Sequence, residues 1–189
     1  MDSVAMLQRV VDETTRLVDG TTGELLDRPT PCEGWTARDL VNHITGGATM
    51  FAMSAEQGSV PDELVAQFMG GDNLGGDPQG AWKTAAARAM AAFEQPGVLE
   101  KLVTLPFGEM PAGVALSIAI FDVATHATDL ARATGQTVGD TGMLEVALEI
   151  GQQMIGPELR APGVFDEAQP VATDAPIADR LLAFAGRRL

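Results

Sequence analysis

The chain has 189 residues, of which 46% are hydrophobic, and its formal net charge is −14. A chain of this length can bury a core without disulfides or a structural metal, so we expect a single domain over residues 1–189. The acidic charge argues against nucleic acid and against an anionic membrane surface as partners, because both bind basic proteins.

The first helix is expected from about Val4 to Val18, where apolar residues recur on one face, and it ends around Asp19-Gly20. A loop with two prolines and a glycine follows. Thr36 and Asp39 then resemble a capping box, which predicts a helix from about Ala37 to Glu56.

Six further elements are predicted from periodicity, caps and breakers. They are a short helix at Asp62–Met69, a helix at Pro78–Glu94, an extended piece at Leu102–Leu105, a long apolar helix from Pro111 to Thr134 with Gly135 as its C′ residue, a helix from Thr141 to Glu158 with interruptions at Gly151 and Gly156, and a last helix at Ile177–Ala185. Four long amphipathic helices with short accessory pieces predict an all-α, up-and-down four-helix bundle.

Compartment signals point to the cytoplasm. The N-terminus has acids early and no basic region, so no signal peptide is expected. No uninterrupted apolar run reaches the roughly 18–20 residues that span a bilayer. Cys32 is the single cysteine, so no intrachain disulfide can form.

Both histidines of the chain, His43 and His126, fall inside predicted helices. Asp122 lies one turn before His126, so the two side chains share a helical face with Cβ atoms ~5–6 Å apart. A facing helix could add His43, as in the metal sites of helix bundles. The alternative is a purely structural role, in which Asp122 and His126 form a hydrogen bond and His43 is an ordinary core histidine.

Three runs of the sequence resemble a known group. The run from Thr30 to Thr36, followed by Asp39 and His43, looks like the signature at the second helix of the DinB-like superfamily, and more narrowly of the mycothiol-dependent maleylpyruvate isomerase N-terminal domain. The run from Asp122 to Gly135 is similar to the second signature of that group. The ending from Asp179 to Arg187 is similar to the C-terminal motif of an actinobacterial branch.

The resemblance implies a DinB-like four-helix bundle and a divalent metal held by His43, Asp122 and His126. Two imidazoles and one carboxylate suit zinc best, with nickel or iron as alternatives, and they leave coordination positions open. The isomerase relatives carry glutamate where this chain has Asp122, so the carboxylate is retained on a side chain one methylene shorter. The isomerase also has an additional C-terminal domain, and no segment of this sequence is expected to form one.

The implied chemistry is activation of a thiol cofactor such as mycothiol, because a coordinated thiol is deprotonated. The thiolate would attack a small electrophile, giving S-transfer or isomerisation. The expected partners are therefore a small-molecule thiol and an electrophilic substrate. A homodimer is a further alternative, because alanine-rich helix faces could pack against a second copy of the chain.

Three other functions compete with this hypothesis. They are a non-catalytic metal- or small-molecule-binding protein, an iron oxygenase with two histidines and one carboxylate, and a bundle whose site is vestigial. The oxygenase ranks low because that triad usually occurs on β-barrels.

Several neighbouring residues have two interpretations each. Asp129 either orients a histidine or forms a salt bridge with Arg132 on a solvated face. Gly46 and Gly47 either leave space beside a metal or allow close helix packing. Trp35 is expected to anchor its loop against the core. Cys32, in the loop before the helix of His43, is expected to be neither ligand nor nucleophile.

Overall fold

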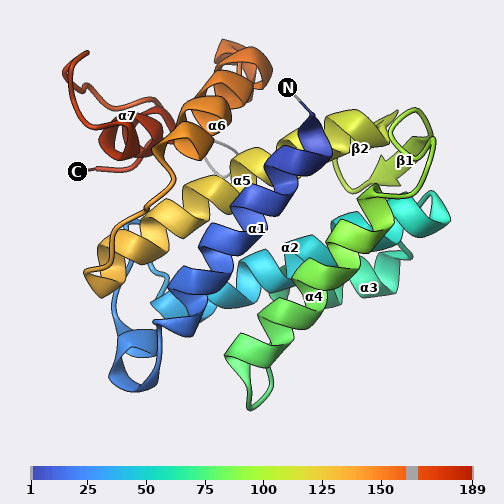
Figure 1. The fold of residues 1–189 in the computed structure, drawn as a ribbon, viewed down its shortest axis with the longest axis horizontal. Coiled ribbons are helices and arrows are strands. Elements are labelled where there is room, and N and C mark those ends of the chain that lie inside the picture. The colour runs from blue at the N-terminus through green and yellow to red at the C-terminus, as the bar shows by residue number, and fades with distance from the viewer. Residues whose placement is uncertain (1, 161–165, 189) are drawn as a thin grey trace.

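The structure is a computed structural model that describes residues 2–160 and 166–188 (Figure 1). The described residues form seven α-helices, two 3₁₀ helices and one two-stranded sheet. In chain order they are α1 (Ser3–Asp19), η1 (Gly23–Asp27), α2 (Ala37–Gln57), α3 (Asp62–Gly70), α4 (Pro78–Phe93), β1 (Leu102–Leu105), β2 (Gly108–Pro111), α5 (Ala112–Thr134), α6 (Thr141–Met154), η2 (Pro157–Leu159) and α7 (Ile177–Phe184).

Helices α1, α2, α4 and α5 make a four-helix bundle, as predicted. Both α1 and α2 pack against α4 and α5, so α1 and α2 lie diagonally across the bundle (Figure 1). Side chains from all four helices fill the core between them. The largest fully buried ones include Leu17, Leu40, Trp82, Leu116, Ile120 and Leu130. Helices α6 and α7 pack against α5 and against each other, outside the bundle.

The predicted caps explain where the bundle helices begin and end. The Thr36 hydroxyl accepts the Asp39 N–H at 3.2 Å, and the Asp39 carboxylate accepts the Thr36 N–H at 2.9 Å, so the capping box at the start of α2 is confirmed. Gly135 closes α5 in the left-handed conformation with φ 73°, as expected for a C′ glycine.

Two predictions of local structure need correction. Helix α6 ends at Met154, not Glu158, because Pro157 lacks an N–H and disfavours helical geometry at the residue before it. The extended piece at Leu102–Leu105 is confirmed, but it pairs antiparallel with Gly108–Pro111, which no sequence signal indicated. The long helix therefore starts at Ala112, one residue after Pro111.

Helix α5 is long and apolar enough to cross a membrane by length and composition alone. In this fold, however, 78% of its most apolar window is buried. That burial is what the central helix of a bundle requires, since such a helix faces neighbours on most sides. The same helix carries two of the predicted site residues.

Candidate metal centre

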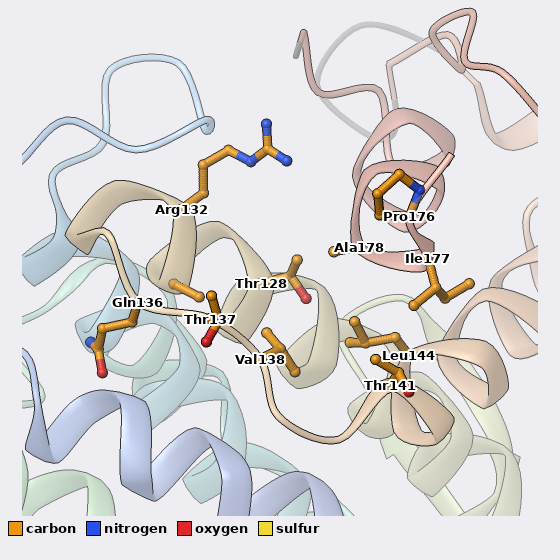
Figure 2. Close-up of a pocket in the computed structure, with 11 residues that line it drawn as sticks. Thr128, Arg132, Gln136, Thr137, Val138, Thr141, Leu144, Pro176, Ile177 and Ala178 are labelled. Carbon is orange, nitrogen blue, oxygen red and sulfur yellow. The ribbon is translucent and has the colours of Figure 1, made fainter. Parts of the chain in front are cut away.

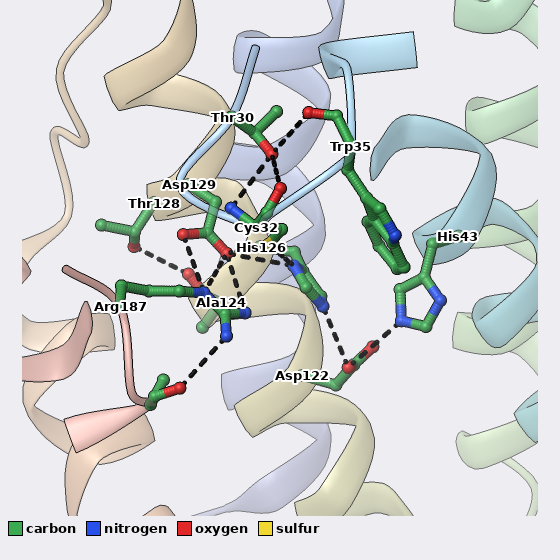
Figure 3. Close-up of polar contacts among 11 residues, drawn as sticks. Thr30, Cys32, Trp35, His43, Asp122, Ala124, His126, Thr128, Asp129 and Arg187 are labelled. Atoms are coloured by element: carbon green, nitrogen blue, oxygen red, sulfur yellow. Dashed lines mark hydrogen bonds and ion pairs between the residues drawn. The ribbon is translucent and has the colours of Figure 1, made fainter. Parts of the chain in front are cut away.

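The two halves of the predicted triad come from facing helices. His43 lies on α2, and Asp122 and His126 lie one turn apart on α5, which packs against α2. Figure 3 shows the three side chains converging, with the Asp122 carboxylate between the two imidazoles. Their potential ligand atoms all lie within 4.8 Å of one another. The fold therefore brings together the three residues that the sequence resemblance implied.

The separations match donor atoms around one ion better than strong hydrogen bonds. Asp122 Oδ1 lies 3.5 Å from His43 Nε2 and 3.6 Å from His126 Nε2. A typical N–H···O bond measures about 2.7–3.2 Å. Two donors at about 2.1 Å from a tetrahedral ion are about 3.4 Å apart. The donor set and its spacing fit a divalent cation.

The electrostatics favour a charged carboxylate at the centre of this group. Burial favours the neutral acid, but the charge of His43, its hydrogen bond and the charge of His126 outweigh it and lower the pKa of Asp122 to about 2. Burial likewise opposes the imidazolium form of His43, but Asp122 outweighs it and raises the pKa of His43. Asp122 is therefore ionised at neutral pH, which is the state that binds a metal.

Access to the group is uneven. The side chains of His43 and Asp122 are 27% and 29% exposed, whereas that of His126 is 10% exposed. Solvent thus reaches the group from the side of His43 and Asp122, while His126 forms its inner wall. An ion held here would have neighbouring positions open to water or to a ligand.

Asp129 lies behind His126, fully buried, and contacts it directly. Its Oδ2 lies 3.1 Å from His126 Nδ1, on the ring edge away from Asp122 (Figure 3). Of the two interpretations of Asp129, the structure shows the contact with a histidine. The predicted salt bridge to Arg132 is absent among the described residues, because Arg132 pairs with Asp179 on α7.

Two further groups complete the surroundings of Asp129. The guanidinium of Arg187 donates to Asp129 through Nε at 3.2 Å and Nη2 at 3.1 Å, both to Oδ2. The Cys32 thiol donates to the same oxygen at 3.1 Å. Burial, followed by the charge of Asp129, raises the pKa of Cys32 to about 12, so this sulfur is a neutral thiol.

Cys32, His126 and Asp129 also have their potential ligand atoms close together. A cation placed among them would face the Arg187 guanidinium, which already occupies the carboxylate. Within the described part of the chain, no Arg or Lys pairs directly with the cluster of His43, Asp122 and His126, so this cluster is the better candidate for a metal.

Trp35 packs against the hydrophobic core, as expected for the residue that anchors this loop. It also stacks on His126 with ring centroids 5.8 Å apart and lies 5.0 Å from the ring of His43, which was not expected. It is therefore a wall of the site. No spacing signal could have shown this, because Trp35 precedes α2 and reaches both rings only in the folded chain.

The two neighbouring glycines, Gly46 and Gly47, have different surroundings. A Cβ on Gly46 would lie 2.1 Å from the carbonyl oxygen of Phe68, so this glycine permits close packing of α3 on α2. A Cβ on Gly47 would have Asp122 Oδ2 as its nearest neighbour at 3.9 Å. Gly46 therefore serves close helix packing, while Gly47 lies beside the Asp122 carboxylate of the candidate centre.

Two cavities lie elsewhere in the described structure. One of about 410 Å³ sits where α5, α6 and α7 meet, lined by Thr128, Leu144 and Ile177 among others (Figure 2). The other, of about 450 Å³, lies between α2 and α4 beside Thr49 and Arg88. Neither is lined by His43, Asp122 or His126.

Comparison with known proteins establishes the family. Residues 7–131, which include the triad, match the mycothiol maleylpyruvate isomerase N-terminal domain family. The chain belongs to this family. Two uncharacterized proteins of Mycobacterium tuberculosis, from strains CDC 1551 and H37Rv, are each 35% identical over 193 residues, covering 99% of this chain and 98% of theirs.

Solved structures show the same fold. The crystal structure of the mycothiol-dependent maleylpyruvate isomerase aligns with a TM-score of 0.64 at 19% identity, over 79% of this chain and 66% of that chain. A histidine-to-alanine mutant of that isomerase aligns with a TM-score of 0.65 at 17% identity, with the same coverage. The all-α DinB-like bundle predicted from the sequence is thus confirmed, and the chain spans about two thirds of the isomerase.

Proposed function

We propose that His43, Asp122 and His126 bind one divalent ion, zinc by preference, and that the protein is a cytoplasmic metal-dependent thiol S-transferase or isomerase acting on small electrophiles. The observation that carries the proposal is the convergence of three donor atoms, two of the pairs 3.5 and 3.6 Å apart, on a solvent-accessible side of the bundle. The N₂O donor set suits zinc and also accepts nickel or iron.

A thiol from outside the chain is the nucleophile that this site requires. The single cysteine, Cys32, has a pKa raised to about 12, so the protein offers no thiolate of its own near the site. The family description names mycothiol as the thiol. A divalent ion in this place would lower the pKa of a coordinated thiol, so that its sulfur is a thiolate at neutral pH.

The residues of this chain have defined tasks in such a reaction. His43 and Asp122 face solvent and leave the approach open, while Trp35 and His126 close the opposite side. A thiol held at this ion would supply a thiolate for addition to an electrophilic carbon of the substrate. In isomerisation the C–S bond would break again after rotation and return its electron pair to the sulfur as thiolate; in transfer the bond would be kept and a leaving group would depart with its bonding electron pair.

Metal analysis of the purified protein tests the first half of the proposal. We expect close to one zinc per chain in the wild type. His43→Ala and His126→Ala should each abolish stoichiometric metal, whereas Glu145→Gln, at an exposed position on α6, should keep it. Metal retained in both histidine variants would refute the assignment. Iron with oxygen consumption would instead point to an oxygenase.

Calorimetric titration of the zinc-loaded protein with mycothiol tests the second half. Binding should disappear in the metal-free His126→Ala variant. Stoichiometric zinc without any thiol binding at millimolar mycothiol would favour the alternative function, a non-catalytic metal- or small-molecule-binding protein.

A further inference from the structure

Arg187 reaches the candidate metal centre from the far end of the sequence. It follows α7, lies 58 positions beyond Asp129 and falls outside residues 7–131 of the family match. Its side chain is only 19% exposed and extends toward α5 (Figure 3). The C-terminal segment therefore contributes a charged group to a site otherwise built from α2, α5 and the loop before α2.

The chain reversal after α7 explains how Arg187 reaches this position. Gly186 adopts the left-handed conformation with φ 87°. Its N–H bonds to the carbonyl of Ala183, and the Arg187 N–H bonds to the carbonyl of Leu182. This pair of bonds is a Schellman motif, which ends a helix and turns the chain back on itself. A residue with a side chain at Gly186 would also meet Asp166, at 2.6 Å.

The contacts of Asp129 form a relay to His126. Arg187 donates Nε at 3.3 Å to Oδ1, and Nε and Nη2 at 3.2 and 3.1 Å to Oδ2. Oδ2 in turn lies 3.1 Å from His126 Nδ1. A fully buried carboxylate needs a cation and several donors to be stable, and Arg187 supplies both.

We propose that Arg187 is a positioning residue for the metal centre: by holding Asp129, it fixes the His126 imidazole with Nδ1–H toward Asp129 and with Nε2 free toward Asp122 and His43. The proposal rests on the proposed function, because Nε2 is the atom assigned to the ion. Carboxylates behind metal-binding histidines act in this way, orienting the ring and selecting the tautomer.

The tautomer of His126 can be measured directly in the metal-free protein. Because the chain has only two histidines, an imidazole ¹⁵N–¹H spectrum contains two ring systems, and His43→Gln assigns them. At a pH where both rings are neutral, wild-type His126 should show a single tautomer with hydrogen on Nδ1. Arg187→Gln should change this to a mixture, and Arg187→Lys, which keeps the charge, should restore part of the pattern.

Arg188→Gln is the matched control, since it removes the same charge one residue later at an exposed position. Its spectrum should equal that of the wild type. Zinc affinity, measured by competition with a chromophoric chelator, should fall about 10–100-fold in Arg187→Gln and stay unchanged in Arg188→Gln. Thermal melts confirm that each variant is folded.

The outcomes separate the two proposals. An unchanged His126 spectrum and unchanged zinc affinity in folded Arg187→Gln would overturn the positioning role and leave Arg187 as an anchor of α7. A wild-type protein that binds no zinc, yet shows the expected tautomer and its loss in Arg187→Gln, would refute the metal site while supporting the relay.

Discussion

The Cys32 thiol illustrates how the environment of one side chain decides its chemistry. It is surrounded by Asp129 and His126, at 3.1 and 3.7 Å, and its pKa is raised to about 12. Because the thiolate is the reactive form, alkylation by iodoacetamide at pH 8 should be at least about a hundredfold slower in the native protein than in urea. Mass spectrometry at timed intervals measures both rates. Native modification at the rate of a free thiol would contradict the assignment.

The same shift has a consequence for stability. The folded protein holds the Cys32 proton more tightly than the unfolded chain does. Its contribution to the free energy of unfolding is therefore complete below about pH 9 and is lost as pH rises toward 12.

Thr14 gives a second prediction for a single residue. Among the described residues, its Oγ1 and that of Thr125 are the buried side-chain oxygens without a hydrogen-bond partner. Thr14→Val replaces that hydroxyl with a methyl group of similar shape and removes the unpaired polar atom. We expect about 1 kcal/mol of stabilisation and a rise in Tm of about 2–4 °C. Thr15→Val, which removes the partner of the Trp82 indole N–H, should instead destabilise the protein.

The site residues differ in how far the sequence revealed them. The helical spacing of Asp122 and His126 was sufficient to place them on one face. His43 came from the resemblance alone, since no local pattern states which helices face each other. Trp35 and Arg187 lie within the runs that carry the resemblance, but those runs did not reveal their contacts with the site, because these contacts form only when the loop and the C-terminal segment fold onto α5.

Among the elements, the contact of α2 with α3 depends on the first of two consecutive glycines, Gly46. Gly46→Ala should be strongly destabilising, because its Cβ would lie 2.1 Å from the backbone oxygen of Phe68. Gly47→Ala is its matched control: the nearest atom is at 3.9 Å, and alanine in a helix interior is favoured by about 0.5–1 kcal/mol. Urea unfolding of both variants measures the difference. Equal midpoints would show that α3 does not pack as described.

The element boundaries followed the sequence where a cap or breaker marks them. Thr36 and Gly135 mark helix ends by chemistry that acts within a few residues, and both were predicted correctly. The strand β2 was missed because its four residues, Gly108–Pro111, have no alternating apolar pattern. Only the partner strand makes them extended.

For the whole molecule, whose formal net charge is −14 at pH 7, ion pairs make the contribution of some acidic residues to stability depend on pH. The hydrogen bonds of Arg9 hold the pKa of Asp140 below its ordinary value, and a similar cause lowers that of Glu13 beside Arg16. A lowered pKa contributes stability at neutral pH that is lost as pH falls through the folded-state value. Acid should therefore lower the stability of the protein as pH falls below about 4.

Asp140→Asn tests how much the ion pair with Arg9 contributes to stability. The variant keeps the N-cap of α6, since asparagine also caps helices. At pH 7 the variant should be less stable by at most about 1 kcal/mol, because the pair with Arg9 is partly exposed. The difference from wild type should shrink as pH falls below about 4. If thermal melts showed the same difference in stability between variant and wild type at every pH, the ion pair would contribute nothing.

The position of the Trp35 ring, stacked on His126 and 5.0 Å from the ring of His43, also gives the protein an intrinsic fluorescence signal for the centre. The chain has no tyrosine and two tryptophans, and the other one, Trp82, is buried with its indole N–H bonded to Thr15. Cobalt or nickel held by His43 and His126 would lie within a few ångströms of one emitting ring and would quench its fluorescence. In a Trp82→Phe background, occupancy of the centre can therefore be followed by light emission alone, without a dye or a chelator.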